Sequence, residues 1–588
     1  MNTTEPQHPD LSEAAKPADS PPPADAPVTV GAGINFTDPN SPLAFAYLRA
    51  SHLVAISFLA LVFLYFGVFT PLAHSDIWGH MKYGEWIVAN HALPEYEPFC
   101  EFADRSQPVG QFQWLSQVIF YLAFHAGAVL AGGDDLRQTA GGVEMLRTLY
   151  GVLVILKIGL VMAAIRRSTR SMPLAIVGAV FFFLLTMGNI RVQRPQIFGE
   201  IFFAFLVWWV SAPRLSALTG LVVPLVLAVW ANCHGSFVVG MMFVGLFWSG
   251  RVVELLWKER LTRSFLTSPD LRNGLAAVVA APIAIGILNP HGFAIYSMVF
   301  ALTRNPNIHT MGEWSPLDFS QVESGGHWLY LATLVILAIS QLASPRPLPV
   351  ARLFVLFPFA IGPLSQQRMM AWWLILVPWF ATLLWQHALV HLPKRWLQNR
   401  TEASLRKTFV GAFIIVCAFI WSGLFQLLAG KDPLPLATTT THATMWPLAM
   451  ELKHGKGMPE LHEALKHYPN QRFQGRMLLQ ENMADFLVWS LPEKPPVLVY
   501  SHAHVFPEYF WREYLHAMAG GPGWDSMLNR YRVNLLVVDP DAWNGLAEKL
   551  RHDPNWDVLL DEGQGSQSTL PPTVGNVKLF IVIRKHPI

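Results

Sequence analysis

Long apolar runs recur through most of the chain, and they constrain its fold more than any other feature. A run of about twenty apolar residues is the length that crosses a lipid bilayer as a helix. The 588 residues are 52% hydrophobic and only 14% charged, against about 25% charged in an ordinary soluble domain. We therefore expect an all-α polytopic membrane protein rather than a soluble enzyme.

Hydropathy predicts about eleven membrane spans, and basic clusters indicate how they are oriented. The spans lie near residues 53–73, 148–165, 172–190, 197–211, 217–233, 236–250, 274–289, 327–343, 351–365, 371–391 and 408–428. Alternate loops carry Arg166, Arg167 and Arg170; Arg251, Lys258, Arg260 and Arg263; and Lys394, Arg395, Arg400, Arg406 and Lys407. Because cytoplasmic loops are enriched in Lys and Arg, we expect a cytoplasmic N-terminus and an external C-terminus.

One further apolar segment, residues 112–130, carries Gln113, Gln117 and His125. Counting it as a span would invert every later loop against the basic clusters. We therefore expect a helix that lies at the membrane surface inside a large first external loop.

Composition divides the chain into three parts. Residues 1–43 are rich in Pro, Ala and acidic residues and are expected to form a disordered cytoplasmic tail. Residues 44–430 form the transmembrane domain, with the first external loop at 74–147. In residues 431–588 charges return, and short β-rich runs at 497–500, 535–539 and 577–584 alternate with helical patterns. These features predict a small extracytoplasmic α/β domain.

Several function classes are excluded by what the sequence lacks. The formal net charge is only +2, so no overall field attracts nucleic acid. The three cysteines are scattered and define neither a disulfide framework nor a zinc site. No Walker A string occurs, which argues against ATP-driven transport.

Polar residues that are costly near hydrocarbon gather at the predicted external ends of the spans. Such residues commonly face a functional cavity. They are Asp76, His80, Arg191, Arg194, Gln196, Asn232, His234, Asn289, His291, Glu313 and Arg368. Plainer roles remain open: the arginines could snorkel to the interface, and the two Asn-x-His-Gly strings could be turns bent at Gly235 and Gly292.

Asp76 is the sharpest candidate for a catalytic role. A helix that begins after Ser75 puts Asp76 and His80 one turn apart on one face, with Trp78 and Trp86 suited to the membrane interface. A carboxylate there could accept a proton from an incoming hydroxyl. The alternative is that Ser75 or Asp76 simply caps the helix.

The arginines at the predicted external ends of the spans suggest how the leaving group of such a reaction is stabilised. Guanidinium groups match phosphate oxygens, and a lipid-linked phosphosugar offers a phosphate at this depth. Arg191, Arg194 and Arg368 would stabilise the charge that develops on the phosphate as the glycosidic bond breaks.

A series of strings in fixed order resembles a group of bacterial integral membrane proteins that are similar to GT-C glycosyltransferases. The strings are DIWGHMKYGEWIVANHALPEYEPF, QFQWLSQVIFY, RPQIF, WANCHGSFVVG, LNPHGF and EWSPLDF. The resemblance covers about residues 50–385 and implies a polyprenyl-phosphate sugar donor, inversion at the sugar carbon and an acidic residue in the first external loop. Asp76 matches that acidic residue, but Ile77 and Trp78 stand where the common pattern has a second carboxylate.

The first hypothesis is therefore a glycosyltransferase of the bacterial cytoplasmic membrane that transfers a hexosyl or pentosyl group to an extracytoplasmic acceptor. Asp76 would act as base or acceptor orienter with His80 beside it, and the other residues would bind substrate. No cofactor is required by the residues, although a divalent cation stays open. The alternative is a non-catalytic scaffold or lipid-binding subunit of a membrane complex with the same fold.

Overall fold

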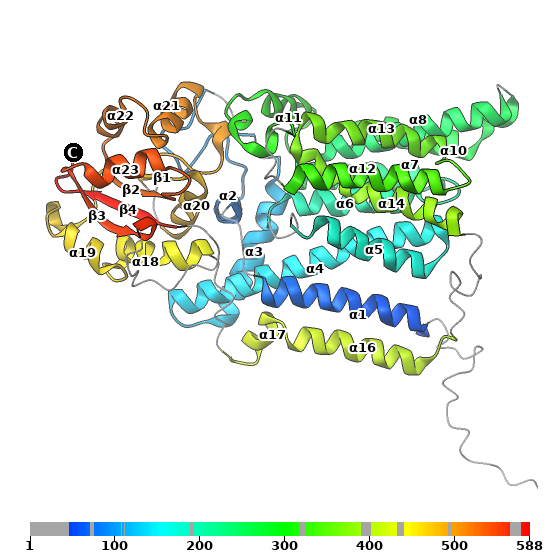
Figure 1. Ribbon diagram of the computed structural model, residues 1–588, viewed down its shortest axis with the longest axis horizontal. Coiled ribbons are helices and arrows are strands. Elements are labelled where there is room, and N and C mark those ends of the chain that lie inside the picture. The colour runs from blue at the N-terminus through cyan, green and yellow to red at the C-terminus, as the bar shows by residue number, and fades with distance from the viewer. Residues whose placement is uncertain are drawn as a thin grey trace, which may run out of the picture.

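The computed structural model describes residues 46–70, 76–106, 109–110, 112–188, 193–260, 262–317, 319, 325–389, 402–431, 440–491, 496–564 and 578–588. Within these residues the chain is mostly helical, with a small sheet near the C-terminus (Figure 1). The tail predicted at residues 1–43 lies outside them.

Seven helical segments in this part of the chain are long and apolar enough to cross a membrane. In chain order they are Ala50–Phe69 (α1, Ala50–Leu64, continued by the π-helical turn η2, Tyr65–Phe69), Trp114–Ala131 (α3), Asp135–Thr169 (α4), Phe237–Lys258 (within α8, Phe237–Glu259), Pro269–Leu288 (α10), Gly326–Ala343 (within α12, Gly325–Ala343) and Gln367–Ala388 (η6, Gln367–Met369, followed by α14, Met370–Ala388). These segments confirm a membrane-embedded, predominantly helical protein.

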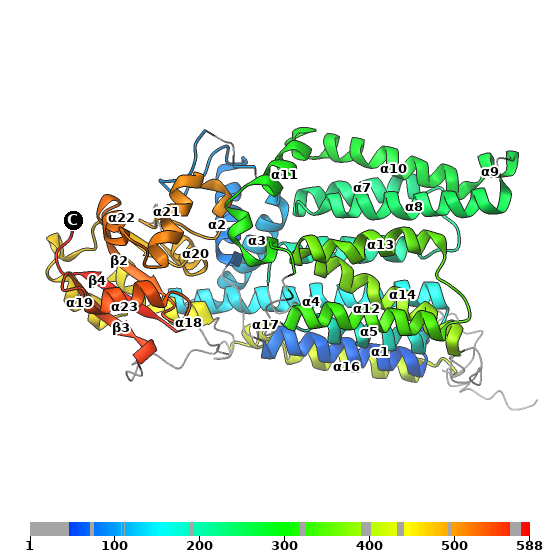
Figure 2. The same ribbon diagram turned by 45° about the horizontal axis from the view of Figure 1, so that its top comes forward.

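Shorter helices pack beside the long ones. They are α5 (Met172–Thr186), α6 (Gln196–Val210), α7 (Thr219–Cys233), α13 (Val350–Ser365) and α16 (Leu405–Ile420). In Figures 1 and 2 their axes lie roughly parallel or antiparallel to those of α4 and α8, so they belong to one bundle, with α16 at its edge beside α1. Apolar side chains such as Leu184, Phe357 and Phe413 point out of this bundle, as expected where lipid is the solvent.

The axis of helix α3 is not parallel to the axes of the bundle helices. In both ribbon views it runs across the other helices, at the bundle end that faces the C-terminal domain. It packs closely on α4, because a Cβ atom on Gly127 would lie 2.3 Å from the carbonyl oxygen of Gly141. The helix therefore forms where the sequence predicts one, and it lies transverse to the bundle even though its length and hydropathy would allow a span.

Helix α2 (Asp76–Asn90) separates the bundle from the C-terminal domain. It begins at Asp76, as the sequence predicts. The expected interfacial position of Trp78 is wrong, because the side chain is completely buried. Its ring packs edge-on against Phe486 of the C-terminal domain, with 5.0 Å between ring centroids. The sequence could not show that a folded domain would cover this face of the helix.

The C-terminal domain is built around a four-stranded sheet of order β1-β2-β4-β3. The β1–β2 pair is parallel and the other two pairs are antiparallel. The strands are β1 (Arg476–Leu479), β2 (Val533–Val538), β3 (Trp556–Asp561) and β4 (Phe580–Arg584), and the larger helices are α18 (Thr440–His454), α20 (Glu481–Ser490), α21 (Glu508–Met518) and α23 (Asn544–His552). Two of the three predicted strands are therefore present, whereas the 497–500 run contributes only an isolated bridge from Val497 to Met477.

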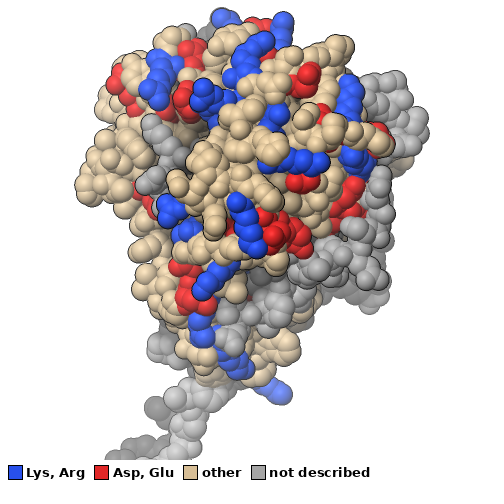
Figure 3. Space-filling model, turned by 90° about the vertical axis from the view of Figure 1, so that its left-hand side faces the viewer, with Lys and Arg blue, Asp and Glu red and all other residues tan. Residues whose placement is uncertain are grey.

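The outer face of this domain is charged, unlike the bundle. Figure 3 shows Lys, Arg, Asp and Glu side chains interspersed over it, without a large region of one sign. Such a surface is typical of a domain in water.

A buried carboxyl group joins the segment that follows α2 to the C-terminal domain. Tyr83 of α2 and Tyr500 both donate hydrogen bonds from their hydroxyls to Oε2 of Glu97, the second at 2.6 Å. The backbone N–H of Phe99 donates to Oε1 at 2.8 Å. Burial raises the pKa of Glu97, and the hydrogen bonds from Tyr500 and Tyr83 oppose that effect. The domain is thus fixed to this segment by a satisfied polar network rather than by a flexible tether.

We expect Glu97→Ala to loosen this docking, because it removes the carboxylate that accepts from both buried hydroxyls. The Tyr83 and Tyr500 hydroxyls lie 2.9 Å apart, so one can still donate to the other and only one is left without an acceptor. A lost buried partner costs about 1–3 kcal/mol per group. Limited proteolysis of the purified protein measures the free energy of unfolding. This free energy should fall by about 1–3 kcal/mol. The matched control is Glu101→Ala, which breaks the solvent-exposed ion pair with Arg476 and should cost less than about 1 kcal/mol. Equal effects of the two changes would contradict a structural role for Glu97.

Candidate functional site

A cavity of about 530 Å³ lies between the bundle end and the C-terminal domain. This volume is in the range of small-molecule sites. Six of the residues singled out from the sequence line it: Asp76, His80, Arg194, His234, Glu313 and Arg368. We call it the outer cavity.

An alternating set of charges forms one wall of the outer cavity. Nε of Arg194 lies 3.0 Å from Oδ2 of Asp76, and Nη1 of the same guanidinium is paired with Glu313. Nη1 of Arg368 lies 3.5 Å from the other oxygen of Glu313. Asp76, Arg194, Glu313 and Arg368 therefore form one chain of ion pairs, which we call the charged cluster.

Each member of the cluster stands at the end of a helix or in a short turn. Asp76 opens α2, where the positive end of the helix dipole favours a carboxylate. Arg194 lies two residues before α6 begins. Glu313 lies in the 3-10 turn η5 (Gly312–Trp314), and Arg368 in η6. The two turns are joined by a hydrogen bond from the Gln367 N–H to the Ser315 carbonyl, 2.9 Å long.

The cluster keeps Glu313 ionised. Burial alone would raise the pKa of its carboxyl group, but the charges of Arg368 and Arg194 outweigh burial and lower it. For Arg194 burial acts in the opposite direction, and Asp76 and Glu313 together raise its pKa. The resting site therefore holds its charges in pairs, and an incoming anion must exchange with a carboxylate.

Arg368 has the loosest pairing in the cluster. Its contact with Glu313 is the longest of the three ion pairs, and its guanidinium lies 4.8 Å from the centre of the Trp314 ring. On its other side, Nη2 lies 3.4 Å from Nε2 of His234. This guanidinium is the one that an oxyanion can engage with the least rearrangement.

The hydrogen bonds of His234 define its role. The N–H of Ser236 donates to Nδ1 at 3.1 Å, and the Ser236 hydroxyl is 2.6 Å from the same nitrogen. Both ring nitrogens of His234 face a donor, because Nη2 of Arg368 can only donate toward Nε2 and the Ser236 N–H donates to Nδ1. A neutral ring accepts at only one of its two nitrogens. Burial lowers the pKa of His234 well below its usual value, and the nearby Arg368 lowers it further. The neutral His234 ring and the Arg368 guanidinium thus lie side by side in the wall of the outer cavity.

His80 is held from the opposite side by α3. Nε2 of Gln117 lies 3.3 Å from Nδ1 of His80, and Nε2 of Gln113 lies 3.5 Å from it. An amide nitrogen donates, so Nδ1 accepts and the Nε2 of a neutral ring carries the proton. The transverse helix α3 therefore orients the imidazole next to Asp76.

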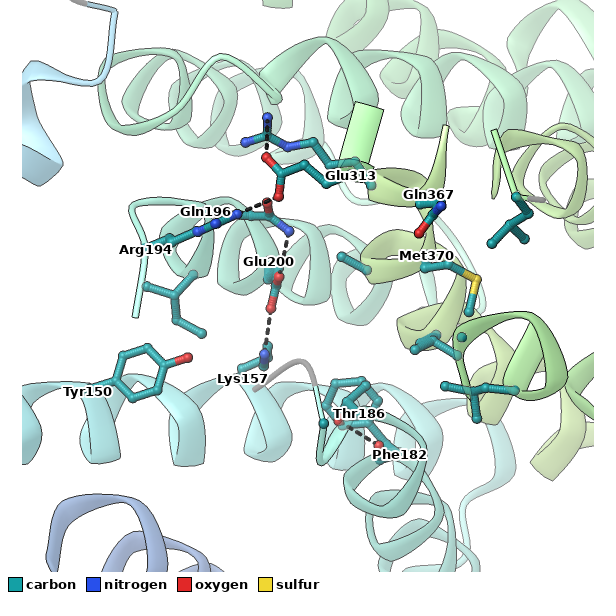
Figure 4. A pocket seen from close by; sticks show the side chains of 18 residues that line it. Tyr150, Lys157, Phe182, Thr186, Arg194, Gln196, Glu200, Glu313, Gln367 and Met370 are labelled. Carbon is teal, nitrogen blue, oxygen red and sulfur yellow. Dashed lines mark hydrogen bonds and ion pairs between the residues drawn. The ribbon is translucent and has the colours of Figure 1, made fainter. Parts of the chain in front are cut away.

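A second cavity, of about 570 Å³, extends from the charged cluster into the bundle (Figure 4). We call it the bundle cavity. Arg194, Glu313 and Arg368 line both cavities, so the cluster forms the wall between them. In Figure 4 a column of polar side chains leads inward: Gln196 donates to Glu200 at 3.0 Å, and Glu200 pairs with Lys157 of α4. Gln196 thus lines the bundle cavity, whereas the other side of the cluster faces the outer cavity.

Three of the predicted residues line neither cavity. The side-chain amide of Asn232 accepts from Nε1 of Trp114 at 2.8 Å and donates to the Ala228 and Leu288 carbonyls. Asn289 donates to Asn232 at 3.3 Å and accepts the N–H of His291 at 3.0 Å. These bonds hold the ends of α7 and α10 together, which agrees with the turn interpretation. Arg191 lies outside the described residues.

Several cavity residues were not singled out from the sequence. Ser501, His502 and His504 of the C-terminal domain line the outer cavity, and the His-x-His string after the β-rich 497–500 run was the available signal. Lys157 and Glu200 line the bundle cavity. Both lie inside predicted spans, where a charged residue is in itself a functional signal.

The described part of this site does not fit a divalent cation. Among the described residues, no group of three or more His, Cys, Asp or Glu side chains is placed to hold a metal ion. The carboxylates of Asp76 and Glu313 are each directed at a guanidinium instead.

Comparison with known proteins adds no assignment. No protein-family model matches the chain, and no curated protein matches it.

The docked C-terminal domain should respond to pH through His504. Burial lowers the pKa of His504 from its usual 6.5 to about 4, so between these values the unfolded chain binds a proton that the folded one does not. Stability contributed by this group is present above pH 6.5 and is lost as pH falls toward 4. We expect wild-type protein to lose more unfolding free energy than His504→Gln when pH is lowered from about 7 to about 5. Parallel losses in thermal unfolding would contradict this.

Proposed function

We propose that the protein is a GT-C-like membrane glycosyltransferase, which transfers a sugar from a polyprenyl phosphate to an extracytoplasmic acceptor. The observation that carries the proposal is the position of the charged cluster. Two guanidinium groups stand between a cavity inside an apolar bundle and a cavity beneath a water-facing domain. A lipid phosphate that bears a sugar has its anionic group at the same kind of boundary.

In this proposal the bundle crosses the bacterial cytoplasmic membrane eleven times. The crossings would be α1, α4, α5, α6, α7, α8, α10, α12, α13, α14 and α16, with α3 at the external surface. The basic ends of α4 (Arg166, Arg167) and α8 (Lys258, Arg260) lie at the bundle end away from the C-terminal domain. That arrangement supports a cytoplasmic N-terminus and an external domain.

The donor phosphate would bind at Arg368 and His234. Nη2 of Arg368 and Nε2 of His234 are 3.4 Å apart and lie on the outer-cavity side of the cluster. As the bond between the sugar carbon and the phosphate oxygen breaks, its electron pair stays on that oxygen. Arg368 and Arg194 then stabilise the growing negative charge electrostatically.

Asp76 would act on the acceptor side. An ion-paired carboxylate is a weaker base than one without a cationic partner, so its pairing with Arg194 favours an orienting role over proton abstraction. From the start of α2 it would hold the acceptor hydroxyl and stabilise positive charge at the sugar carbon. The residues thus divide between the leaving phosphate and the attacking hydroxyl.

The same geometry suits a second candidate function, a non-catalytic lipid-binding subunit. The observation that favours it is the mutual pairing of the cluster charges in the resting site. Such a subunit binds a polyprenyl phosphate and never turns over a sugar donor. Turnover therefore distinguishes the two candidates.

Arg368→Gln should weaken binding of undecaprenyl phosphate, because it removes the cation that is least committed to a carboxylate. Losing a charge-assisted hydrogen bond of about 1.5–3 kcal/mol weakens binding about tenfold or more. Binding can be measured on full-length protein in nanodiscs with radiolabelled lipid. Arg512→Gln, on the exposed side of α21, is the matched control and should bind as the wild type does. Unchanged affinity in Arg368→Gln would remove the cluster from the phosphate site.

Asp76→Asn should abolish sugar transfer while protein abundance stays unchanged, and undecaprenyl phosphate should bind at least as tightly as to the wild type because Arg194 loses a competing carboxylate. The amide keeps the shape of the side chain but removes the charge that faces Arg194 and the acceptor. The expected loss of transfer rate is about a hundredfold or more. Asp541→Asn, which alters an exposed pair with Lys578, controls for substitution as such. Full transfer by Asp76→Asn would refute its assignment.

A further inference from the structure

The C-terminal domain completes the outer cavity instead of lying beside it. Ser501, His502, Ala503 and His504 line this cavity together with Asp76 and Arg368. Residues 501–504 follow the last bundle helix in sequence, whereas Asp76 and Arg368 come before it. The domain therefore has a position from which it can take part in the reaction.

His502 is the buried member of this segment. Its side chain is only 6% exposed, and among the described residues its Nε2 has no hydrogen-bond partner. The other ring nitrogen, Nδ1, lies 3.4 Å from the hydroxyl oxygen of Ser501. A buried polar atom without a partner is unusual and calls for a ligand.

The segment is held rigidly in place. The side-chain amide of Asn307 donates to the carbonyls of Ala503 at 3.0 Å and Phe506 at 2.8 Å. Asn305 donates to the His504 carbonyl at 3.2 Å, and the Val505 carbonyl accepts the N–H of Asp104 at 2.7 Å. Hydrogen bonds from two separate loops, one with Asp104 and one with Asn305 and Asn307, therefore fix residues 503–506 in place. A preorganised site requires such support.

The first turn of α2 comes unusually close to His502. A Cβ atom on Gly79 would lie 3.4 Å from Cε1 of His502 and 2.7 Å from Oδ1 of Asp485 in α20. The His80 and His502 rings have their centroids 5.2 Å apart. Any larger residue at position 79 would therefore require the Asp485 carboxyl group to move away from the turn that carries Asp76 and His80.

The surroundings of His502 keep its ring neutral at rest. Burial lowers its pKa well below the usual value, His80 and His504 lower it further, and the charge of Asp76 acts in the opposite direction. Burial raises the pKa of Asp485 well above its usual value, and the charge of Asp76 adds to this rise. The titratable groups that face the ring are Asp76, His80 and Tyr83 of α2, Asp485 of α20, and Tyr500 and His504 of its own segment.

We propose that His502 is a catalytic residue, supplied by the C-terminal domain, that accepts the proton of the acceptor hydroxyl on Nε2. This inference rests on the proposed function. The acceptor oxygen forms a bond to the sugar carbon, the bond from that carbon to the phosphate oxygen breaks, and the electron pair leaves with the phosphate. The hydroxyl proton goes to Nε2, Nδ1–H faces Ser501, and Asp76 stabilises the resulting imidazolium ion.

The test replaces His502 with Gln, which cannot accept a proton in the same way, and compares it with His552→Gln on the exposed face of α23. Full-length variants are expressed in a strain that lacks the gene, and right-side-out membrane vesicles supply the native acceptor. The donors are tritiated glucose, mannose, galactose and arabinose, each linked to undecaprenyl phosphate. Label in the lipid-extracted residue measures transfer, and radiolabelled undecaprenyl phosphate measures lipid binding.

His502→Gln should lower kcat about a hundredfold or more, the usual contribution of a general base. The KM for the donor and the affinity for undecaprenyl phosphate should stay unchanged, which also shows that the variant is folded. The fall of the wild-type rate at acidic pH should disappear in the residual rate of the variant. His552→Gln should match the wild type throughout.

The outcomes separate the two claims. Wild-type activity in His502→Gln, or a loss confined to KM, overturns the role of His502 and leaves the glycosyltransferase standing. A variant that no longer binds undecaprenyl phosphate shows that His502 acts through the structure, which also overturns a catalytic role. Wild-type protein that binds the lipid but transfers none of the sugars contradicts the proposed enzyme and its proton acceptor together.

Discussion

The site depends on the two ion pairs that the guanidinium group of Arg194 makes with Asp76 and Glu313. This group pairs with Asp76 at the start of α2 and with Glu313 in η5, so one side chain before α6 joins α2 and a later turn to the bundle. In a partly buried setting these pairs are strong only while both partners are present, since removing one leaves a charge uncompensated. Asp76, Glu313 and the wall between the two cavities are therefore joined through a single cation.

The sequence predicted the elements of the fold better than their assembly. Apolar length was enough to locate the long helices, and helical spacing placed Asp76 and His80 on one face of α2. The Arg194–Asp76 pair and the Glu97 network join residues that are distant in the chain, and no local pattern encodes which of them meet. For Asn232 and Asn289 the turn interpretation describes the contacts best, because their amides are consumed in binding α7 to α10.

The sequence did not show how the C-terminal domain packs against the rest of the protein. Its composition indicated a soluble fold, but composition does not show which surface a domain buries. Trp78 was expected at a lipid interface and is instead covered by Phe486. The same docking carries His502 into the outer cavity, which a search limited to the membrane helices could not find.

The position of the 501–504 segment has a consequence for biogenesis. Ribosomes deliver the bundle first, and the residues that finish the outer cavity belong to the final part of the polypeptide. Until that part has folded against α2, the cavity lacks one side. A newly made bundle would thus hold an incomplete cavity, and docking of the later residues would complete it.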